Sequence, residues 1–106
     1  MDPILLTKEQ RKLLQDPVTD AGSVTVGITA VRVVDYNLER RLAIITNDSA
    51  ADIYLGFGSS LAVNTGMRLN ALGGSFEFGL FTTFPWLGEI WAISAGAGNT
   101  LTFVEV

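Results

Sequence analysis

Carboxylates are the main candidate catalytic groups, because the chain contains neither histidine nor cysteine. The absence of these residues excludes serine triads, thiol nucleophiles, disulfides and metal sites built on thiolate or imidazole ligands. Glu77 and Glu89 could form the two carboxyl groups that a glycosidase holds at a defined separation. Each, however, occupies a position of an alternating strand that should face solvent. We therefore interpret both as outer-face residues.

Two other patterns suggest ligand binding but are better explained as turns. Asp48 and Asp52 carry oxygen ligands suited to calcium, but no spaced series like that of an EF-hand loop accompanies them. Gly96-Ala97-Gly98 lacks the lysine and the following helix of a phosphate-binding loop, so we expect a hairpin turn there. We expect no catalytic residue, no metal ion and no cofactor.

Aromatic residues offer a possible carbohydrate-binding surface, since exposed rings on β-sandwich modules stack on sugars. Tyr54, Trp86 and Trp91 are available, and Trp91 lies in an apolar strand where packing is expected. Trp86, beside Pro85 in an irregular segment, is the candidate most exposed to solvent. We favour the interpretation that Phe84 and Trp86 close one end of the core or meet another subunit, because apolar patches on soluble chains commonly mark interfaces.

The elements that would position these residues are strands. Residues 42–46 and 53–57 flank a polar turn that begins at Asn47, and the pattern predicts a hairpin. In the second strand apolar residues alternate with Tyr54 and Gly56, as expected when one face is buried. The first strand is apolar on both faces, which predicts a central position in a sheet.

Further strands are predicted from residue 24 to the end of the chain. A bulge, or the junction of two short strands, is expected near Val31. Turns are expected at residues 64–66, with Gly66 at positive φ, and at residues 72–75. The last strand, residues 100–106, could occupy a sheet edge. The fold class is therefore all-β: a small β-sandwich or jelly-roll-like barrel of about seven or eight antiparallel strands.

Residues 1–23 differ from this domain, which spans residues 24–106. Thr7 and Gln10 match a capping box, and a helix of about two turns is predicted for residues 8–15. Asp16-Pro17 ends it, and residues 16–23 form a linker. Because so short a helix is unstable alone, this N-terminal arm must dock on its own domain or on another chain.

The net charge of −4 disfavours binding to nucleic acid or to an acidic membrane. Arg40-Arg41 is the only adjacent arginine pair, and we interpret it as a solvated strand entry. Apolar runs are far shorter than the ~20 residues that span a bilayer. The first ten residues lack the features of a signal peptide.

Several strand and turn segments resemble small structural proteins of tailed bacteriophage virions, of the capsid decoration or cement type. These segments lie at residues 45–49, 53–56, 64–69, 73–76 and 88–94. The resemblance covers roughly residues 42–106 and includes no catalytic motif. Similar segments occur in phage tail and receptor-contacting modules, so a β-sandwich module that binds a host glycan is the alternative.

The resemblance implies a non-enzymatic protein that is made in the host cytoplasm and binds the capsid surface of the virion. Its expected partners are the major capsid protein and other copies of itself, most simply as a trimer. Oligomer or capsid contacts are expected at two groups of apolar residues. The first group is in the arm (Ile4, Leu5, Leu13 and Leu14) and the second is in the irregular segment (Phe84, Pro85, Trp86 and Leu87).

Overall fold

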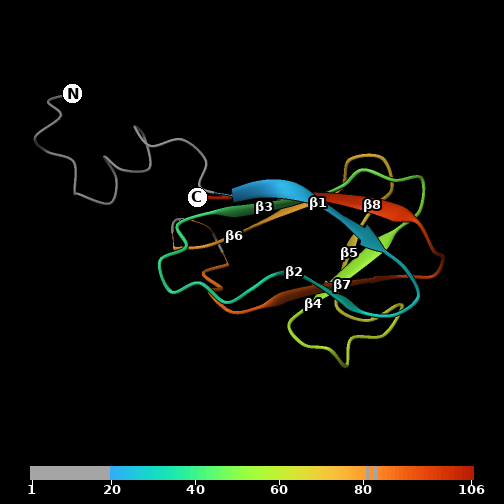
Figure 1. Ribbon diagram of the computed structural model, residues 1–106, viewed down its shortest axis with the longest axis horizontal. Coiled ribbons are helices and arrows are strands. Elements are labelled where there is room, and N and C mark those ends of the chain that lie inside the picture. Colours follow the sequence, from blue (N-terminus) through green and yellow to red (C-terminus); the bar gives the residue numbers. More distant parts are fainter. Residues whose placement is uncertain (1–19, 81, 83) are drawn as a thin grey trace, which may run out of the picture.

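The computed structural model describes residues 20–80, 82 and 84–106, and this part of the chain is all-β (Figure 1). It contains eight strands and no helix, hence none long and apolar enough to cross a membrane. The strands are β1 (Asp20–Val26), β2 (Val31–Val34), β3 (Ala43–Asn47), β4 (Ile53–Gly56), β5 (Met67–Leu69), β6 (Ser75–Phe78), β7 (Ile90–Ser94) and β8 (Asn99–Glu105). The predicted fold class is confirmed at this level.

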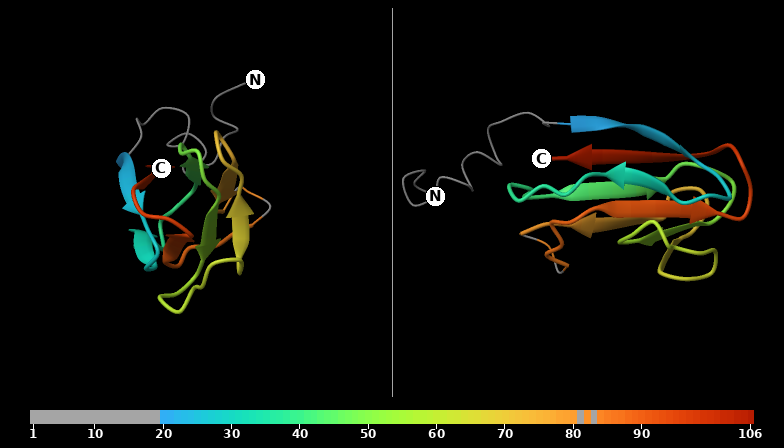
Figure 2. Two further views of the ribbon diagram at one scale, coloured as in Figure 1. Left: turned by 90° about the vertical axis from the view of Figure 1, so that its right-hand side faces the viewer. Right: turned by 60° about the horizontal axis from the view of Figure 1, so that its bottom comes forward.

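Two four-stranded antiparallel sheets pack face to face (Figure 2). Sheet A has the order β1-β8-β3-β6 and sheet B has the order β2-β7-β4-β5. The first strand thus pairs with the last, the second with the seventh, the third with the sixth and the fourth with the fifth. Successive pairs alternate between the sheets, as if one long hairpin had been rolled into two layers.

This topology corrects three predictions. β3 is central, as predicted, but β3 and β4 belong to opposite sheets and do not form a hairpin. Gly96-Ala97-Gly98 likewise joins β7 of sheet B to β8 of sheet A. β8 lies between β1 and β3 instead of at an edge. Alternating burial reports which face of a strand is covered, and it is the same for a hairpin and for a crossing between two packed sheets.

The turn after β3 is held by Asn47, whose side chain is fully buried. Its Nδ2 donates to the carbonyl oxygens of Ala51 (2.7 Å) and Leu69 (2.9 Å). Its Oδ1 accepts from the Ser49 backbone N–H (3.0 Å) and hydroxyl (2.7 Å). One amide therefore satisfies the polar groups of the crossing and ties it to β5, as buried polar groups require.

The core lies between the inner faces of the two sheets. It comprises buried apolar residues of both: Val26, Ala43, Ile45, Phe78 and Leu101 from sheet A, and Val33, Val34, Ile53, Leu55, Leu69, Ile90 and Ala92 from sheet B. The irregularity expected near Val31 is a register shift between Arg32 and Val34. Residues 20–23, expected as the end of a linker, form the first half of β1.

Gly66 provides a test of the connection between β4 and β5. Its φ is +82°, as expected, and a Cβ atom there would meet the carbonyl oxygen of Leu55. Gly66→Ala should therefore lower the free energy of unfolding by about 1–3 kcal/mol, measured by urea denaturation. Gly58→Ala in the same connection is the control, because a Cβ atom there meets nothing within 4 Å. Equal stability of the two variants would contradict this account.

Candidate functional site at the loop end

Long connections between strands identify one end of the sandwich as the candidate site. Residues 35–42, 57–66 and 79–89 join strands through eight to eleven residues, whereas the other connections have four or five. The connections 35–42 and 79–89 lie where β1 begins and the chain ends (Figure 1). We call these two connections the loop end. Binding residues concentrate in loops that a rigid scaffold positions, which makes this end the place to examine.

Arg40 is fully buried at the loop end. Its Nε donates to Oε2 of Glu105 at 2.6 Å. Its Nη1 donates to the carbonyl oxygens of Trp86 (3.2 Å) and Gly88 (3.0 Å). Its Nη2 donates to the carbonyl oxygen of Asp35 (2.7 Å). A single guanidinium thus joins both loops to the end of β8.

The expectation of a solvated Arg40-Arg41 pair is therefore wrong for Arg40. A buried charge needs a partner, and Glu105 supplies it together with backbone carbonyls. The flat guanidinium with five donors can serve several acceptors in fixed directions. Arg41 is half-buried, and its Nε has no hydrogen-bond partner in the described part of the chain. Nothing in the sequence distinguishes the buried Arg40 from its neighbour Arg41.

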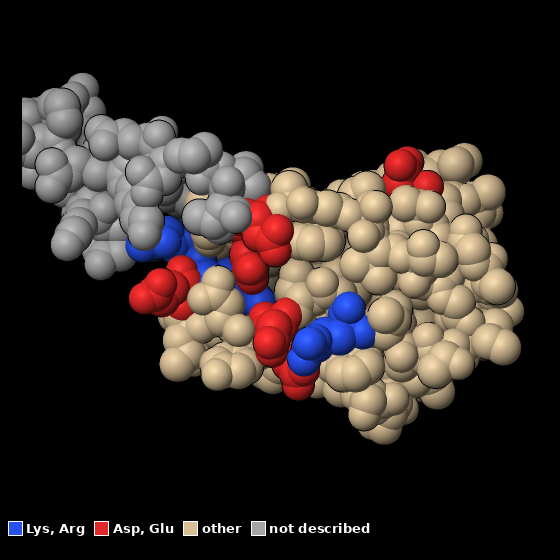
Figure 3. Space-filling view, in the orientation of Figure 1, with Lys and Arg blue, Asp and Glu red and all other residues tan. Residues whose placement is uncertain are grey.

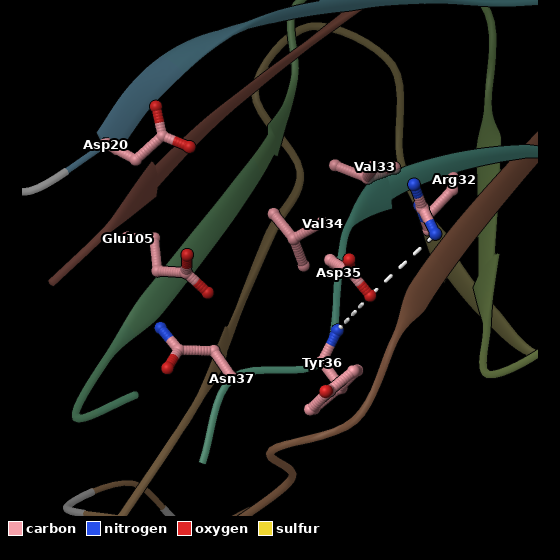
Figure 4. Close-up of a pocket in the computed structure, with 8 residues that line it drawn as sticks. All are labelled: Asp20, Arg32, Val33, Val34, Asp35, Tyr36, Asn37 and Glu105. Carbon is pink, nitrogen blue, oxygen red and sulfur yellow. Dashed lines mark hydrogen bonds and ion pairs between the residues drawn. The ribbon is translucent and has the colours of Figure 1, made fainter. Parts of the chain in front are cut away.

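A polar pocket of about 400 Å³ shares Glu105 with Arg40. It lies at the open side between edge strands β1 and β2, and Figure 4 shows Asp20 and Glu105 on one side with Arg32 and Tyr36 on the other. Charged side chains gather at this end of the face shown in Figure 3. The lining residues are Asp20, Arg32, Val33, Val34, Asp35, Tyr36, Asn37 and Glu105.

The pocket residues Arg32, Asp35 and Glu105 all form ion pairs, partly with residues outside the pocket. Arg32 Nη1 lies 3.2 Å from Oε2 of Glu89 and 3.7 Å from Oδ1 of Asp35. The same Asp35 oxygen accepts the backbone N–H of Tyr36 at 2.8 Å. Among the described residues, no group of three or more acidic, histidine or cysteine side chains could hold a metal ion. The pocket is thus a network of ion pairs that connects β2 to the start of β7.

The carboxylates considered for catalysis are far apart in the topology. Glu77 lies exposed on β6 of sheet A, whereas Glu89 precedes β7 of sheet B and pairs with Arg32. Asp48 and Asp52 occupy the crossing between β3 and β4, at the end opposite the loop end. Oδ1 of Asp52 accepts the backbone N–H of Ala71 at 3.0 Å, a role in turn structure.

An aromatic cluster lies beneath the connection 79–89. Phe57 stacks on Phe84 with ring centroids 5.6 Å apart, and it contacts Trp86 at 4.5 Å. Phe76 and Phe78 of β6 meet Phe84 edge to face at 6.0 and 5.6 Å. The rings of Phe84 and Trp86 also pack against the core. These two residues therefore close one end of the core.

The remaining residues of the predicted interface differ in position. Pro85 is exposed, whereas Leu87 is half-buried and its carbonyl oxygen accepts the backbone N–H of Asn37 at 2.8 Å. The four arm residues Ile4, Leu5, Leu13 and Leu14, and the predicted helix, lie outside the described residues. The structure thus brings the second predicted group together at the loop end.

The aromatic residues considered for sugar binding are engaged within the fold. Trp86 is half-buried, and its Nε1 donates to the carbonyl oxygen of Glu89 at 2.9 Å. The hydroxyl of Tyr54 donates to Oδ1 of Asn64 at 2.7 Å. Trp91 is half-buried on β7, opposite Arg32. None of these three rings lies free on the surface.

Comparison of the chain with protein-family models, with curated proteins and with solved structures gives no significant match. The function must therefore be inferred from the chain's own surfaces and chemistry.

Arg40 provides a test of how the loop end is held. Arg40→Ala removes the guanidinium from the largely buried Glu105 and the donor from three carbonyls, so it should lower the free energy of unfolding by about 3–5 kcal/mol. Arg40→Lys should recover only part of this loss, because an ammonium group cannot reach all four acceptors. Arg68→Ala is the control, since Arg68 is exposed and its loss should cost within about 0.5 kcal/mol. Urea denaturation measures all three; an Arg40→Ala protein as stable as the parent chain would refute this role.

Proposed function

We propose that this chain is a non-enzymatic structural protein of a bacteriophage virion, of the capsid decoration or cement type. It binds the outer surface of the head and strengthens the shell. Its partners are the major capsid protein and further copies of itself, for which a trimer is the oligomer predicted from sequence. The observation that carries the proposal is the set of apolar side chains presented at the loop end.

These side chains project from two adjacent loops. Tyr36 and Leu38 belong to the connection 35–42, and Leu80 and Pro85 to the connection 79–89. The exposed fractions are 74% for Leu38, 64% for Tyr36 and 50% for Leu80. Exposed apolar groups on two neighbouring loops favour a protein interface. Ile28 and Leu72 are also exposed, in two separate turns at the opposite end.

The loops that present this surface are held in place. Arg40 donates to carbonyls in both, and the Asn37 N–H joins them directly through the carbonyl oxygen of Leu87. Within the connection 79–89, the Thr82 hydroxyl oxygen lies 2.9 Å from the carbonyl oxygens of both Gly79 and Phe84 and shares its one hydrogen between them. A surface that is already ordered loses little conformational entropy on binding, which favours its use as a contact.

The strand order adds support of a weaker kind. A hairpin rolled into two four-stranded sheets is the arrangement of a double-sheet jelly roll, an architecture found in viral capsid proteins and also in lectins and cupins. Because one fold serves many functions, this likeness is consistent with a virion role and does not by itself imply one.

Symmetry would make the binding of many copies to the shell strong, although each single contact is weak. One copy contributes only a few apolar side chains, but a shell presents the same site many times. Copies that also contact one another bind as a linked set, so the effective affinity rises without new types of contact. Such a network would offset the outward pressure on the shell.

A glycan-binding function is less well supported. It requires an exposed ring to stack on a sugar, whereas Trp86 packs against Phe57 and the core, and the Tyr54 hydroxyl is bonded to Asn64. Binding on a glycan array that is lost in Trp86→Ala, with the fold intact, would favour that alternative.

Charged substitutions test whether the loop end is the contact surface. Leu38→Glu should weaken binding to purified heads at least about tenfold, because it places a carboxylate in an apolar contact. Ile28→Glu is the matched control: Ile28 is 68% exposed and lies in the connection between β1 and β2, at the opposite end. Co-sedimentation with heads measures the binding. Equal binding of both variants would place the contact elsewhere.

Particles that lack this protein test the strengthening role itself. Such particles should release their genome at lower temperature or lower chelator concentration than complete particles, because the added contacts no longer support the shell. Adding the purified chain back should restore resistance, and adding Leu38→Glu should not. Unchanged resistance without the protein would refute the cement function.

A further inference from the structure

We propose that the open edge of β1 is a self-association site, at which β1 pairs antiparallel with β1 of a second copy of this chain. The two copies would be related by a two-fold axis, and sheet A would continue across the contact as one eight-stranded sheet. The inference goes beyond the virion role and does not depend on it, and it gives a two-fold dimer in place of the trimer expected from the sequence resemblance.

The described part of the chain has four edge strands, and three of them carry features that discourage pairing. β5 has three residues, and β6 and β2 have four each. The register of β2 against β7 is also shifted between Arg32 and Val34. Short edges and irregular register are devices by which proteins prevent sheet-to-sheet association.

β1 carries none of these features. It has seven residues, and all seven pair in unbroken register with β8, from Asp20 with Glu105 to Val26 with Asn99. From Ala21 to Val26 it contains no charged residue and no proline. In Figure 2, right, β1 lies at the outer side of its sheet, next to β8. A long, regular edge whose one charge lies at its first residue is a template for another strand.

The backbone of β1 has unused hydrogen-bonding capacity. In an antiparallel pair, every second residue directs its N–H and C=O groups away from the partner strand. Within the described residues, β1 makes its hydrogen bonds to β8, and no other strand or loop bonds to it. A second strand would satisfy these outward groups.

The sequence of β1 is compatible with its own two-fold copy. With Ser23 opposite Ser23 of the second copy, Ala21 faces Thr25, Gly22 faces Val24 and Asp20 faces Val26. Small side chains meet on the outer face of the sheet. The two Asp20 carboxylates lie about 20 Å apart along the strands, far enough for their repulsion to be screened. No two like charges therefore face each other across the contact, so charge repulsion does not prevent this pairing.

The two chains would enter the paired strands at opposite ends. Residues 1–19 join β1 at Asp20, and in an antiparallel pair the two copies of Asp20 are at opposite ends of the contact. The two attachment points are therefore kept apart. Pairing through two strands buries less than the ~1,200–2,000 Å² of a standard interface, so a weak dimer with a dissociation constant of order ~10–100 µM is expected.

Sedimentation equilibrium of the full-length chain over a range of concentrations tests the proposal. The parent chain should show a reversible monomer–dimer equilibrium. Ser23→Lys places two ammonium groups opposite each other at the two-fold axis and should raise the dissociation constant at least about tenfold. Ser75→Lys is the matched control, since Ser75 is exposed on the same face of sheet A, in the same cross-strand row, on the opposite edge.

A cysteine scan gives an independent measurement, because the chain has no cysteine of its own. Ser23→Cys should form a covalent dimer when oxidised glutathione accepts the two thiol electrons, since directly opposed residues lie within disulfide reach. Ser75→Cys should stay monomeric under the same conditions.

Three outcomes would overturn the proposal. The first is a full-length chain that is monomeric at every concentration, as expected if residues 1–19 of the same copy cover the edge. The second is an oligomer, a trimer included, that Ser23→Lys leaves unchanged. The third is equal cross-linking at Ser23→Cys and Ser75→Cys. A chain that binds heads but fails these tests would retain the virion role and lose the edge contact.

Discussion

The buried guanidinium of Arg40 is the interaction on which the rest of the loop end depends. A cation without solvent must keep its carboxylate and its acceptors, so Glu105 and the carbonyls of Asp35, Trp86 and Gly88 are held together. This arrangement joins the connection after β2, the connection before β7 and the last residue of β8. Long loops would otherwise be the least ordered part of the molecule. Their order allows exposed apolar residues to form a defined surface.

The two ends of the sandwich are therefore built in different ways. At one end short turns cross between the sheets, and Asn47 satisfies their polar groups from inside the fold. At the other end longer connections are tied by a charged network and present Leu38 and Leu80 to solvent. The ordered loop end and the open edge of β1 are both available for contacts with other molecules.

Both surfaces support assembly better than catalysis. At the loop end Asp35, Glu89 and Glu105 are bonded to arginines or to a backbone N–H. Glu77 lies on sheet A, whereas Glu89 precedes β7 of sheet B. Apolar side chains on fixed loops and an unpaired strand edge both bind protein surfaces. A chain with two such surfaces can contact a shell through one and its own copies through the other, which is the geometry that a reinforcing protein of a particle needs.

The sequence by itself determined the all-β fold class, because period-2 alternation with turn residues such as Gly66 located most strands and turns. The absence of histidine and cysteine also limited the possible catalytic and metal-binding groups. For Phe84 and Trp86 the sequence left two positions open, one end of the core or a subunit contact, and the structure shows both residues packed against the core. Only the tertiary structure decided which strands pair, because alternation is identical in a hairpin and in a crossing between sheets. It alone separated buried Arg40 from its neighbour Arg41, since the acceptors of Arg40 come from segments 5 to 65 residues away in sequence.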